Sequence, residues 1–403
     1  MRSVTDHRAV VLSLVAGTPV VDVPVSDAAG LVLAADVTAG EPRPAWDSSS
    51  MDGYAVRSAD LAAASAAAPV SLRVVAEVAA GSARTPVVDP GTAVRIMTGA
   101  PLPPGADSVV RQEDTDRGAP VVGIRHAAVA GDFVRHRGDD VAAGDMVLER
   151  GLELGARHLA AAVAAGVGTL RAHRRPRLAV VSTGAELVPP GEPLRRGQIH
   201  DSNSVLLAAQ LRSAGADVPH VAVVPDDVEA LRAVLDRLDG EVDLVVTTGG
   251  ASVGDHDVVK LALAPGVEFV EVAMQPGKPQ GAGRLPGGTP VLCLPGNPVS
   301  AFVGVEVLVR PVVRRLRGLT DRDRPTEPAV VLDGWRTPPG RAQYMPVALG
   351  TEAGRTTARR ASAGGSASHL VAGLARADGL AVVPADVAEV RAGQTVPVMR
   401  TDG

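Results

Sequence analysis

The sequence predicts a multidomain protein of the α/β plus β class, organised around a three-layer, doubly wound α/β domain. Two observations predict this class. Between Arg177 and Pro325, strand-like apolar runs alternate with helical patterns, which favours a parallel sheet between two layers of helices. Residues 69–112, and again the residues after Pro325, contain short strand-like runs between glycine and proline turns, which favours small β domains.

The elements follow from these patterns in chain order. The first part of the chain predicts a helix over 4–16, a strand over 20–25, and a strand or turn over 31–37. Strands of a compact barrel or sandwich are expected over 70–78, 93–97 and 108–110. A hairpin over 141–147 and an alanine-rich helix over 155–166 follow. The α/β domain predicts strands over 178–182, 218–224, 243–248, 269–272 and 291–294, and helices over 202–213, 226–238 (capped by Asp226) and 298–316.

Composition limits the class of protein. Apolar residues make up 46% and aromatic residues 2% of the 403 residues, so the core is expected to consist of Ala, Val and Leu. The formal charge of −5 does not suggest a nucleic-acid-binding protein. The single cysteine, Cys293, excludes an intrachain disulfide and fits a reducing compartment. With no membrane-spanning run and no signal-peptide pattern, we expect a soluble, cytoplasmic protein without a membrane partner.

The most informative stretch runs from Asp243 to Asp257. An apolar strand is followed by a small-residue turn over 247–254 with three glycines, and Asp255 is placed to cap a helix. This layout brings backbone amides to an anionic ligand at the carboxyl edge of a doubly wound sheet. The alternative is that the glycines serve only the sharp turn.

Polar groups follow other strands of this domain as well. If the strands are parallel, these turns meet at one edge and bring together the carboxylates of Glu186, Asp255 and Asp257 with the cation of Lys278. Amides and a lysine suit a phosphate, and carboxylates beside them suit Mg²⁺. The sequence therefore predicts a magnesium–nucleotide or phosphorylated-ligand site. It contains no Walker or Rossmann glycine pattern and no Cys/His cluster for zinc.

A second polar stretch, over 41–56, has no periodicity and contains a tryptophan, a tyrosine, two aspartates and three serines. Loops of this kind on rigid flanks often carry functional sites. The alternative is a structural loop in which Asp47 and Asp52 cap turns.

Six motifs in order resemble the molybdopterin molybdenumtransferases, the MoeA and gephyrin E-domain type: Asp47-Ser-Ser-Ser-Met-Asp-Gly-Tyr-Ala55, Arg95-Ile-Met-Thr-Gly-Ala-Pro-Leu-Pro103, Ser182-Thr-Gly-Ala-Glu-Leu187, Gly249-Gly-Ala-Ser-Val-Gly-Asp-His-Asp257, Pro276-Gly-Lys-Pro279 and Leu294-Pro-Gly-Asn-Pro-Val-Ser-Ala301. The resemblance implies an elongated four-domain homodimer. Its domains would be a linker or dimerisation domain over 1–45 and 140–175, a β-rich domain over 46–139, a molybdopterin-binding α/β domain over 176–324 and a C-terminal β domain over 325–403.

The resemblance also implies a reaction. Adenylylated molybdopterin and molybdate, with Mg²⁺, would give the molybdenum cofactor and AMP, in a cleft between the α/β and C-terminal domains to which the partner subunit's second domain contributes. A molybdopterin adenylyltransferase is a further partner to consider.

The same resemblance assigns roles to individual residues. Asp52 and Thr98 belong to the loops presented to the partner, Glu186 and Asp257 would handle Mg²⁺ and the phosphates, and Lys278 would hold an anion. The residues expected to bind the nucleotide or pterin are Gly184, Gly249, Gly250, Ser252, Gly254, Pro276, Gly277, Gly296, Asn297, Ser300 and Ser368.

Three positions depart from the family pattern. Ala185 stands where an aspartate is frequent, Gln275 where a lysine is frequent, and Pro346 where an arginine is usual. Arg341 is the nearby cation that could replace the lost charge. The departures keep two alternatives open: a dimeric scaffold or adaptor protein, and a pterin- or nucleotide-binding module that hydrolyses the adenylate without inserting the metal.

Overall fold

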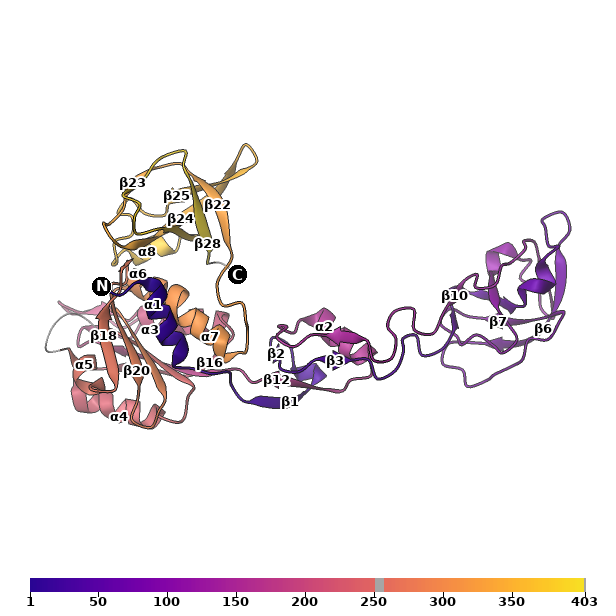
Figure 1. Cartoon of the computed structure of the whole chain (residues 1–403), viewed down its shortest axis with the longest axis horizontal. Helices are drawn as coiled ribbons and strands as arrows, with labels where there is room; N and C mark the ends of the chain where they lie inside the picture. The colour runs from indigo at the N-terminus through magenta and orange to yellow at the C-terminus, as the bar shows by residue number, and fades with distance from the viewer. Residues whose placement is uncertain (251–256, 402–403) are drawn as a thin grey trace.

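The computed structural model describes residues 1–250 and 257–401, and the chain in it is elongated (Figure 1). A mixed α/β layer structure and a C-terminal β barrel lie at one end. From them a slender part of the chain, Val20–His173, extends away and carries a separate sheet at its far end. We refer to Val20–His173 as the arm.

The central sheet of the α/β part has the strand order β16-β13-β17-β21-β20-β18. Its strands are β13 (Arg177–Thr183), β16 (Asp217–Val224), β17 (Leu244–Thr248), β18 (Val267–Glu271), β20 (Pro279–Arg284) and β21 (Pro290–Leu294). Along β13 and β17 the side chains alternate between two cores, with Val180 in one and Val181 in the other. This alternation confirms the predicted three layers.

The prediction of a purely parallel sheet is wrong at one strand. β20 runs antiparallel to both β21 and β18. The sequence did not reveal β20 because its glycines replace an apolar run. A Cβ on Gly281 would lie 2.8 Å from the Phe269 ring, and a Cβ on Gly283 would lie 2.1 Å from the Gly266 carbonyl oxygen. Because β20 is antiparallel, it begins at the edge where β21 ends, so the turn before it lies at that edge.

Helices cover both faces of the sheet. They are α1 (Val4–Ser13), α3 (Asn203–Ser213), α6 (Pro298–Gly304) and α7 (Arg310–Leu316) on one face, and α4 (Val228–Leu238) and α5 (Val258–Leu263) on the other. The sequence places α1 with the linker domain 1–45, but its Val11 packs with Leu178 in the α/β core. The predicted helix 298–316 is interrupted by a π-helical turn, Val305–Val309.

The helix caps differ from the predicted ones. Asp227, not Asp226, caps α4, where its side chain accepts a hydrogen bond from the Ala230 amide. Asp257 caps α5, which begins at Val258. The predicted cap Asp255 lies outside the described residues.

The C-terminal part is a closed barrel in which β24 pairs with both β25 and β26. It consists of β22 (Thr326–Val331), β24 (Ala342–Glu352), β25 (Arg355–Arg360), β26 (Gly379–Val383) and β28 (Thr395–Arg400), with β23 (Trp335–Arg336), β27 (Glu389–Val390) and the short helix α8 (Val371–Leu374) beside it. A two-residue strand of the α/β part, β19 (Met274–Gln275), extends the barrel sheet by pairing with β24.

The arm contains small sheets near the α/β part and a larger sheet at its far end. Near the α/β part lie β1 (Val20–Pro24), β2 (Val32–Leu33), β3 (Val37–Thr38), β11 (Met146–Leu148), α2 (Ala156–Ala164) and β12 (Thr169–His173). At the far end lie β4 (Ser48–Ser49), β5 (Gly53–Val56), β6 (Val70–Val78), β7 (Thr92–Ile96), β8 (Ser108–Arg111), β9 (Val121–Ile124) and β10 (Val134–Arg135).

Two predictions for the arm need correction. Residues 53–56 of the predicted loop form the buried strand β5, which lies between β7 and β8 in the distal sheet. The predicted hairpin over 141–147 does not form, because β11 pairs instead with β3, a strand from a much earlier segment of the sequence.

No helix in the described part of the chain is long and apolar enough to cross a membrane.

Buried His7 predicts a pH dependence of stability. Its side chain lies within α1 and is 1% exposed, and burial, followed by the charge of Arg2, lowers its pKa from 6.5 to about 4. Between these values the unfolded chain binds a proton that the folded chain does not, so stability falls as pH drops from about 6.5 to about 4. The full effect is about 3 kcal/mol. We expect His7→Gln to reduce the difference in melting temperature between pH 7 and pH 4.5. An unchanged difference would refute the assignment.

Candidate functional site

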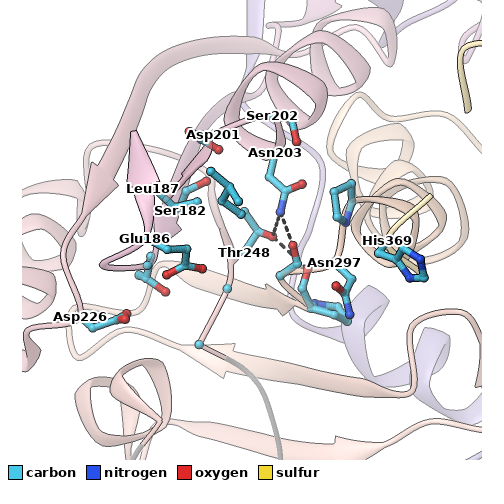
Figure 2. Close-up of a pocket in the computed structure, with 18 of the residues that line it drawn as sticks. Ser182, Glu186, Leu187, Asp201, Ser202, Asn203, Asp226, Thr248, Asn297 and His369 are labelled. Carbon is cyan, nitrogen blue, oxygen red and sulfur yellow. Dashed lines mark hydrogen bonds between the residues drawn. The ribbon is translucent and has the colours of Figure 1, made fainter. Parts of the chain in front are cut away.

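A pocket of about 910 Å³ lies at the carboxyl edge of the central sheet. Loops after β13, β17 and β21 form it, and His369 and Val371 of the C-terminal part contribute to its lining. Figure 2 shows Glu186 and Asp226 on one side of the pocket and Asn297 and His369 on the other. The pocket therefore lies where a doubly wound sheet binds its ligands.

Glycines allow the strand-end loops to pack closely around this pocket. Gly249 and Gly250 have φ angles of 89° and 57°. A Cβ on Gly249 would lie 2.3 Å from the Thr183 carbonyl oxygen, and a Cβ on Gly296 would lie 3.2 Å from the Gly249 Cα atom. Side chains at these positions would therefore push the loops apart. The glycines are thus required sterically by the turn, and the same turn also lines the pocket.

Several carboxylates line the pocket in different hydrogen-bonding states. Asp226 Oδ2 accepts from the Ala185 amide at 3.0 Å, and Asp257 Oδ1 accepts from the Val259 amide at 3.2 Å. The Glu186 carboxylate has no hydrogen bond or ion pair to another described residue. Glu186 therefore has its oxygens available for a bound group.

Two buried polar atoms at the pocket lack a partner among the described residues. Asn203 donates from Nδ2 to Thr248 Oγ1 at 3.1 Å and to the Gly296 carbonyl oxygen at 2.7 Å (Figure 2). Its Oδ1 atom and Thr183 Oγ1 have no hydrogen-bond partner in the described part of the chain. Because buried polar atoms are normally hydrogen-bonded, such atoms in a pocket indicate a polar ligand or water.

Most predicted α/β residues meet in this pocket. Its lining includes Gly184, Glu186, Gly249, Gly250, Asp257, Gly296 and Asn297. Pro276, Gly277, Ser300 and Ser368 are not part of the lining, although neighbouring Pro279 and His369 are. Ser252 and Gly254 lie outside the described residues.

Lys278 lies on the same sheet edge but outside the pocket lining. Its Nζ atom forms an ion pair with Glu271 Oε1 at 2.7 Å, and this hydrogen bond lowers the pKa of the Glu271 carboxyl. Of the three residues predicted to converge, Glu186 and Asp257 line the same pocket, whereas Lys278 lies outside its lining and is paired with Glu271.

Asp52 and Thr98 meet each other in two loops of the distal part of the arm, just before β5 and just after β7. Asp52 Oδ1 accepts from the Thr98 amide at 2.7 Å and from Thr98 Oγ1 at 2.8 Å. These two bonds hold the pKa of the Asp52 carboxyl below its ordinary value. Asp52 directly precedes β5 and Thr98 follows β7, so within one chain the pair belongs to the distal end of the arm, whereas the pocket is lined by residues of the α/β and C-terminal parts at the other end of the molecule (Figure 1).

Sequence reasoning missed a group of pocket residues: Ser182, His200, Asp201, Ser202, Asn203, Asp226, Thr248 and His369. The polar run 200–203 before a helix was a usable signal. His369 is the residue directly after the predicted Ser368. Asp226 was interpreted as a helix cap, and only the strand order brings it beside the Glu186 loop.

The residues present fit a magnesium ion shared with a substrate. No group of three His, Cys, Asp or Glu side chains able to hold a metal occurs among residues 1–250 and 257–401. Mg²⁺ is commonly held by one or two carboxylates plus phosphate oxygens and water, rather than by a complete protein cage. Glu186 and Asp257, lining one pocket, match that smaller donor set.

Fold and pocket together define a class of multidomain protein whose α/β domain carries a polar, glycine-lined pocket at the carboxyl edge of its sheet. The comparisons with known proteins make this class specific. The family model of the MoeA N-terminal region (domain I and II) matches residues 2–166, that of the probable molybdopterin binding domain matches 179–315, and that of the MoeA C-terminal region (domain IV) matches 328–400.

Full-length relatives lead to the same family. Molybdopterin molybdenumtransferase 2 of Mycobacterium tuberculosis (strain H37Rv) is 45% identical over 99% of each chain. Molybdopterin molybdenumtransferase of Nostoc sp. is 36% identical over 99% of this chain and 94% of its own. Two solved structures of molybdopterin biosynthesis MoeA proteins from Pyrococcus horikoshii superpose with TM-scores of 0.86 and 0.81, at 32% and 25% identity, over at least 99% of both chains. The chain belongs to the molybdopterin molybdenumtransferase (MoeA) family.

Proposed function

We propose that this protein is a molybdopterin molybdenumtransferase that takes adenylylated molybdopterin and molybdate and releases the molybdenum cofactor and AMP. The observation that carries the proposal is the pocket at the sheet edge. It combines glycine-lined turns, several carboxylates and buried polar atoms without a described partner, in a chain that is 45% identical, over its length, to a relative of that name.

The pocket residues divide into two roles. The turn at Gly249 and Gly250 and the cap end of α6 at Asn297 bind and orient the phosphate-bearing substrate. Glu186 and Asp257 hold Mg²⁺ together with that substrate. When bound, Mg²⁺ neutralises the charge that develops on the phosphate oxygens as the phosphoanhydride breaks. Cleavage of such a bond depends mainly on charge neutralisation and positioning, which these residues supply.

The active protein is a homodimer in which Asp52 and Thr98 act on the partner's pocket. Within one chain they lie at the far end of the arm, yet their mutual hydrogen bonds fix an ionised carboxylate at a defined position. A two-fold dimer with the arms crossing would bring each pair to the other subunit's pocket.

Two alternatives compete with this function. A scaffold protein is not favoured, because the full-length relatives bear the transferase name and the pocket carboxylates are present. A module that hydrolyses the adenylate without inserting metal is distinguished by product analysis: it would release AMP and leave metal-free molybdopterin.

Incubation of the purified protein with adenylylated molybdopterin, Mg²⁺ and molybdate tests the proposal directly. We expect stoichiometric AMP and metal-loaded cofactor, the latter detected by reconstitution of an apo-molybdoenzyme. Absence of both products with active substrate would refute the transferase function.

Arg341 is the cation we assign to the oxyanion substrate. Its Nη1 atom donates to Gln275 Oε1 at 2.8 Å, and it has no carboxylate partner among the described residues. Gln275, in β19, therefore holds the guanidinium at the junction between the α/β part and the barrel. Pro346, the other departure, is buried in β24 and offers no charge.

Arg341→Gln is expected to raise the molybdate concentration for half-maximal metal insertion about tenfold to a hundredfold, since a charge-assisted bond is lost. AMP release in single turnover should change much less. Arg336→Gln, on the exposed end of β23, is the matched control. A molybdate dependence equal to that of the unmodified protein would contradict the role of Arg341.

A further inference from the structure

Arg317 is a buried cation that the proposed reaction does not use. It follows α7 directly, and its side chain is 6% exposed. Its Nη1 atom donates to the Ala214 carbonyl oxygen, at the end of α3, at 3.0 Å. Its Nη2 atom donates to the Gly30 carbonyl oxygen at 3.0 Å and to Glu153 Oε1 at 2.7 Å. One guanidinium thus joins the α/β part to two segments of the arm.

Glycines make room for this contact. A Cβ on Gly215 would lie 2.5 Å from Arg317 Cζ, so the guanidinium lies directly over the Gly215 backbone. Gly318, the next residue, also lies directly against a side chain, in this case one of the arm. A Cβ on Gly318 would lie 2.3 Å from Cδ2 of His173, the last residue of the arm, whose Nδ1 atom is 2.8 Å from the Thr18 carbonyl oxygen. Residues 317–318 therefore contact the arm in two places.

The covalent connections alone would leave the arm free to swing. It leaves the α/β part after Thr18 and returns at Arg174, and these two strands of chain lie side by side, with Thr18 Oγ1 donating to the Arg174 carbonyl oxygen at 2.7 Å. Two adjacent connections define a hinge. The contacts of Arg317 to Gly30 and Glu153 are made to other segments of the arm and oppose rotation about that hinge.

We propose that Arg317 is a positioning residue that fixes the direction of the arm and thereby sets where Asp52 and Thr98 are presented. The second half of this inference rests on the proposed function, in which this pair completes the partner's pocket. We refer to the contacts of Arg317 with Gly30 and Glu153 as the clamp. Asp52 and Thr98 flank strands of the distal sheet, which the arm carries at its far end (Figure 1). A small rotation of the arm at the clamp therefore displaces these two residues by a large distance.

Spin labels test the clamp independently of activity. Cysteines are introduced at Val121 in the distal sheet and at Leu261 on α5, both exposed, while the native Cys293 is fully buried. Labelled chains are diluted with unlabelled chains so that distances within one subunit are measured. We expect Arg317→Ala and Glu153→Gln to widen the distance distribution about twofold, and Arg317→Lys to widen it less, because lysine cannot bridge all three acceptors.

The matched control is Arg314→Ala, in the helix α7 that directly precedes Arg317. Arg314 binds the Asp321 backbone and side chain rather than the arm. Its distance distribution should equal that of the unmodified protein. Glu153, in the arm and half-exposed, tests the same contact if Arg317→Ala fails to fold.

Turnover gives the second readout. For Arg317→Ala we expect kcat for AMP release to fall about tenfold to a hundredfold with KM for the adenylylated substrate unchanged, since the pocket itself is intact. An unchanged distance distribution in both variants, or a widened one with full kcat, would overturn the proposal. If the unmodified protein releases no AMP, the proposed function fails, while the distance measurement still decides whether the clamp exists.

Discussion

Glu186→Gln is expected to lower AMP release by about two to three orders of magnitude. The substitution keeps the size of the side chain and removes its charge. The Glu186 carboxylate has no partner among the described residues, so its loss leaves no broken contact that would disturb the fold. On the proposed function, the effect should therefore fall on the reaction, in which this charge would hold Mg²⁺ together with the substrate phosphates.

The comparison variant is Glu192→Gln. Glu192 is exposed, follows the same strand end and does not line the pocket, so turnover should remain within about twofold of the unmodified protein. Raising the Mg²⁺ concentration should recover part of the Glu186→Gln activity, because a weakened metal site is filled by mass action. Retained turnover at low Mg²⁺ would exclude Glu186 from the site.

A random mixture of dimers formed from Asp52→Asn and Glu186→Gln subunits is expected to recover about a quarter of normal turnover, although each variant alone is nearly inactive. If the arm of one subunit completes the pocket of the other, the mixed dimer has one intact site and one doubly altered site. Random assembly makes about half of the dimers mixed, and half of their sites work. Co-expression with two affinity tags and an AMP-release assay measures this directly.

The reciprocal mixture distinguishes the two geometries. The double variant Asp52→Asn/Glu186→Gln combined with unmodified subunits should give mixed dimers without an intact site, since each site receives one altered component. If Asp52 acted on the pocket of its own chain, these dimers would keep one working site, and the mixture of single variants would stay inactive. That pattern would contradict the crossed-arm dimer.

Much of the α/β part was predictable because its information is local. The run Leu244–Val246 identifies a strand from a few neighbouring residues, and the glycine turn at 249–250 carries its backbone requirement in its own sequence. Aspartates also marked the region where α4 begins, although the cap is Asp227 rather than the predicted Asp226. β20 escaped prediction for the opposite reason. Its glycines are required by Phe269 and Gly266, which are brought against it only by folding.

The pocket residues also divide into those that local sequence predicts and those that only folding brings to the site. Glu186 and the glycines follow strands closely, and Asp257 caps the helix that comes after β17, so the rule that parallel strands end at one edge was enough to bring them together. Asp226 and His369 reach the pocket through the strand order and through the docking of the C-terminal part, which no local pattern encodes. The pairing of Lys278 with Glu271 arises from the antiparallel pairing of β18 with β20, which a parallel prediction could not contain.

By itself, the sequence determined the class of the fold, the carboxylates and turns of the site, and the family resemblance, because these depend on short-range periodicity and on motifs that keep their order along the chain. Only the tertiary structure decided that Asp52 and Thr98 stand at the far end of an arm, that Lys278 is engaged by Glu271, and that Arg317 clamps the arm in place. Each of these depends on which segments meet after folding, and contacts between segments far apart in the chain are set by the packing of the assembled layers.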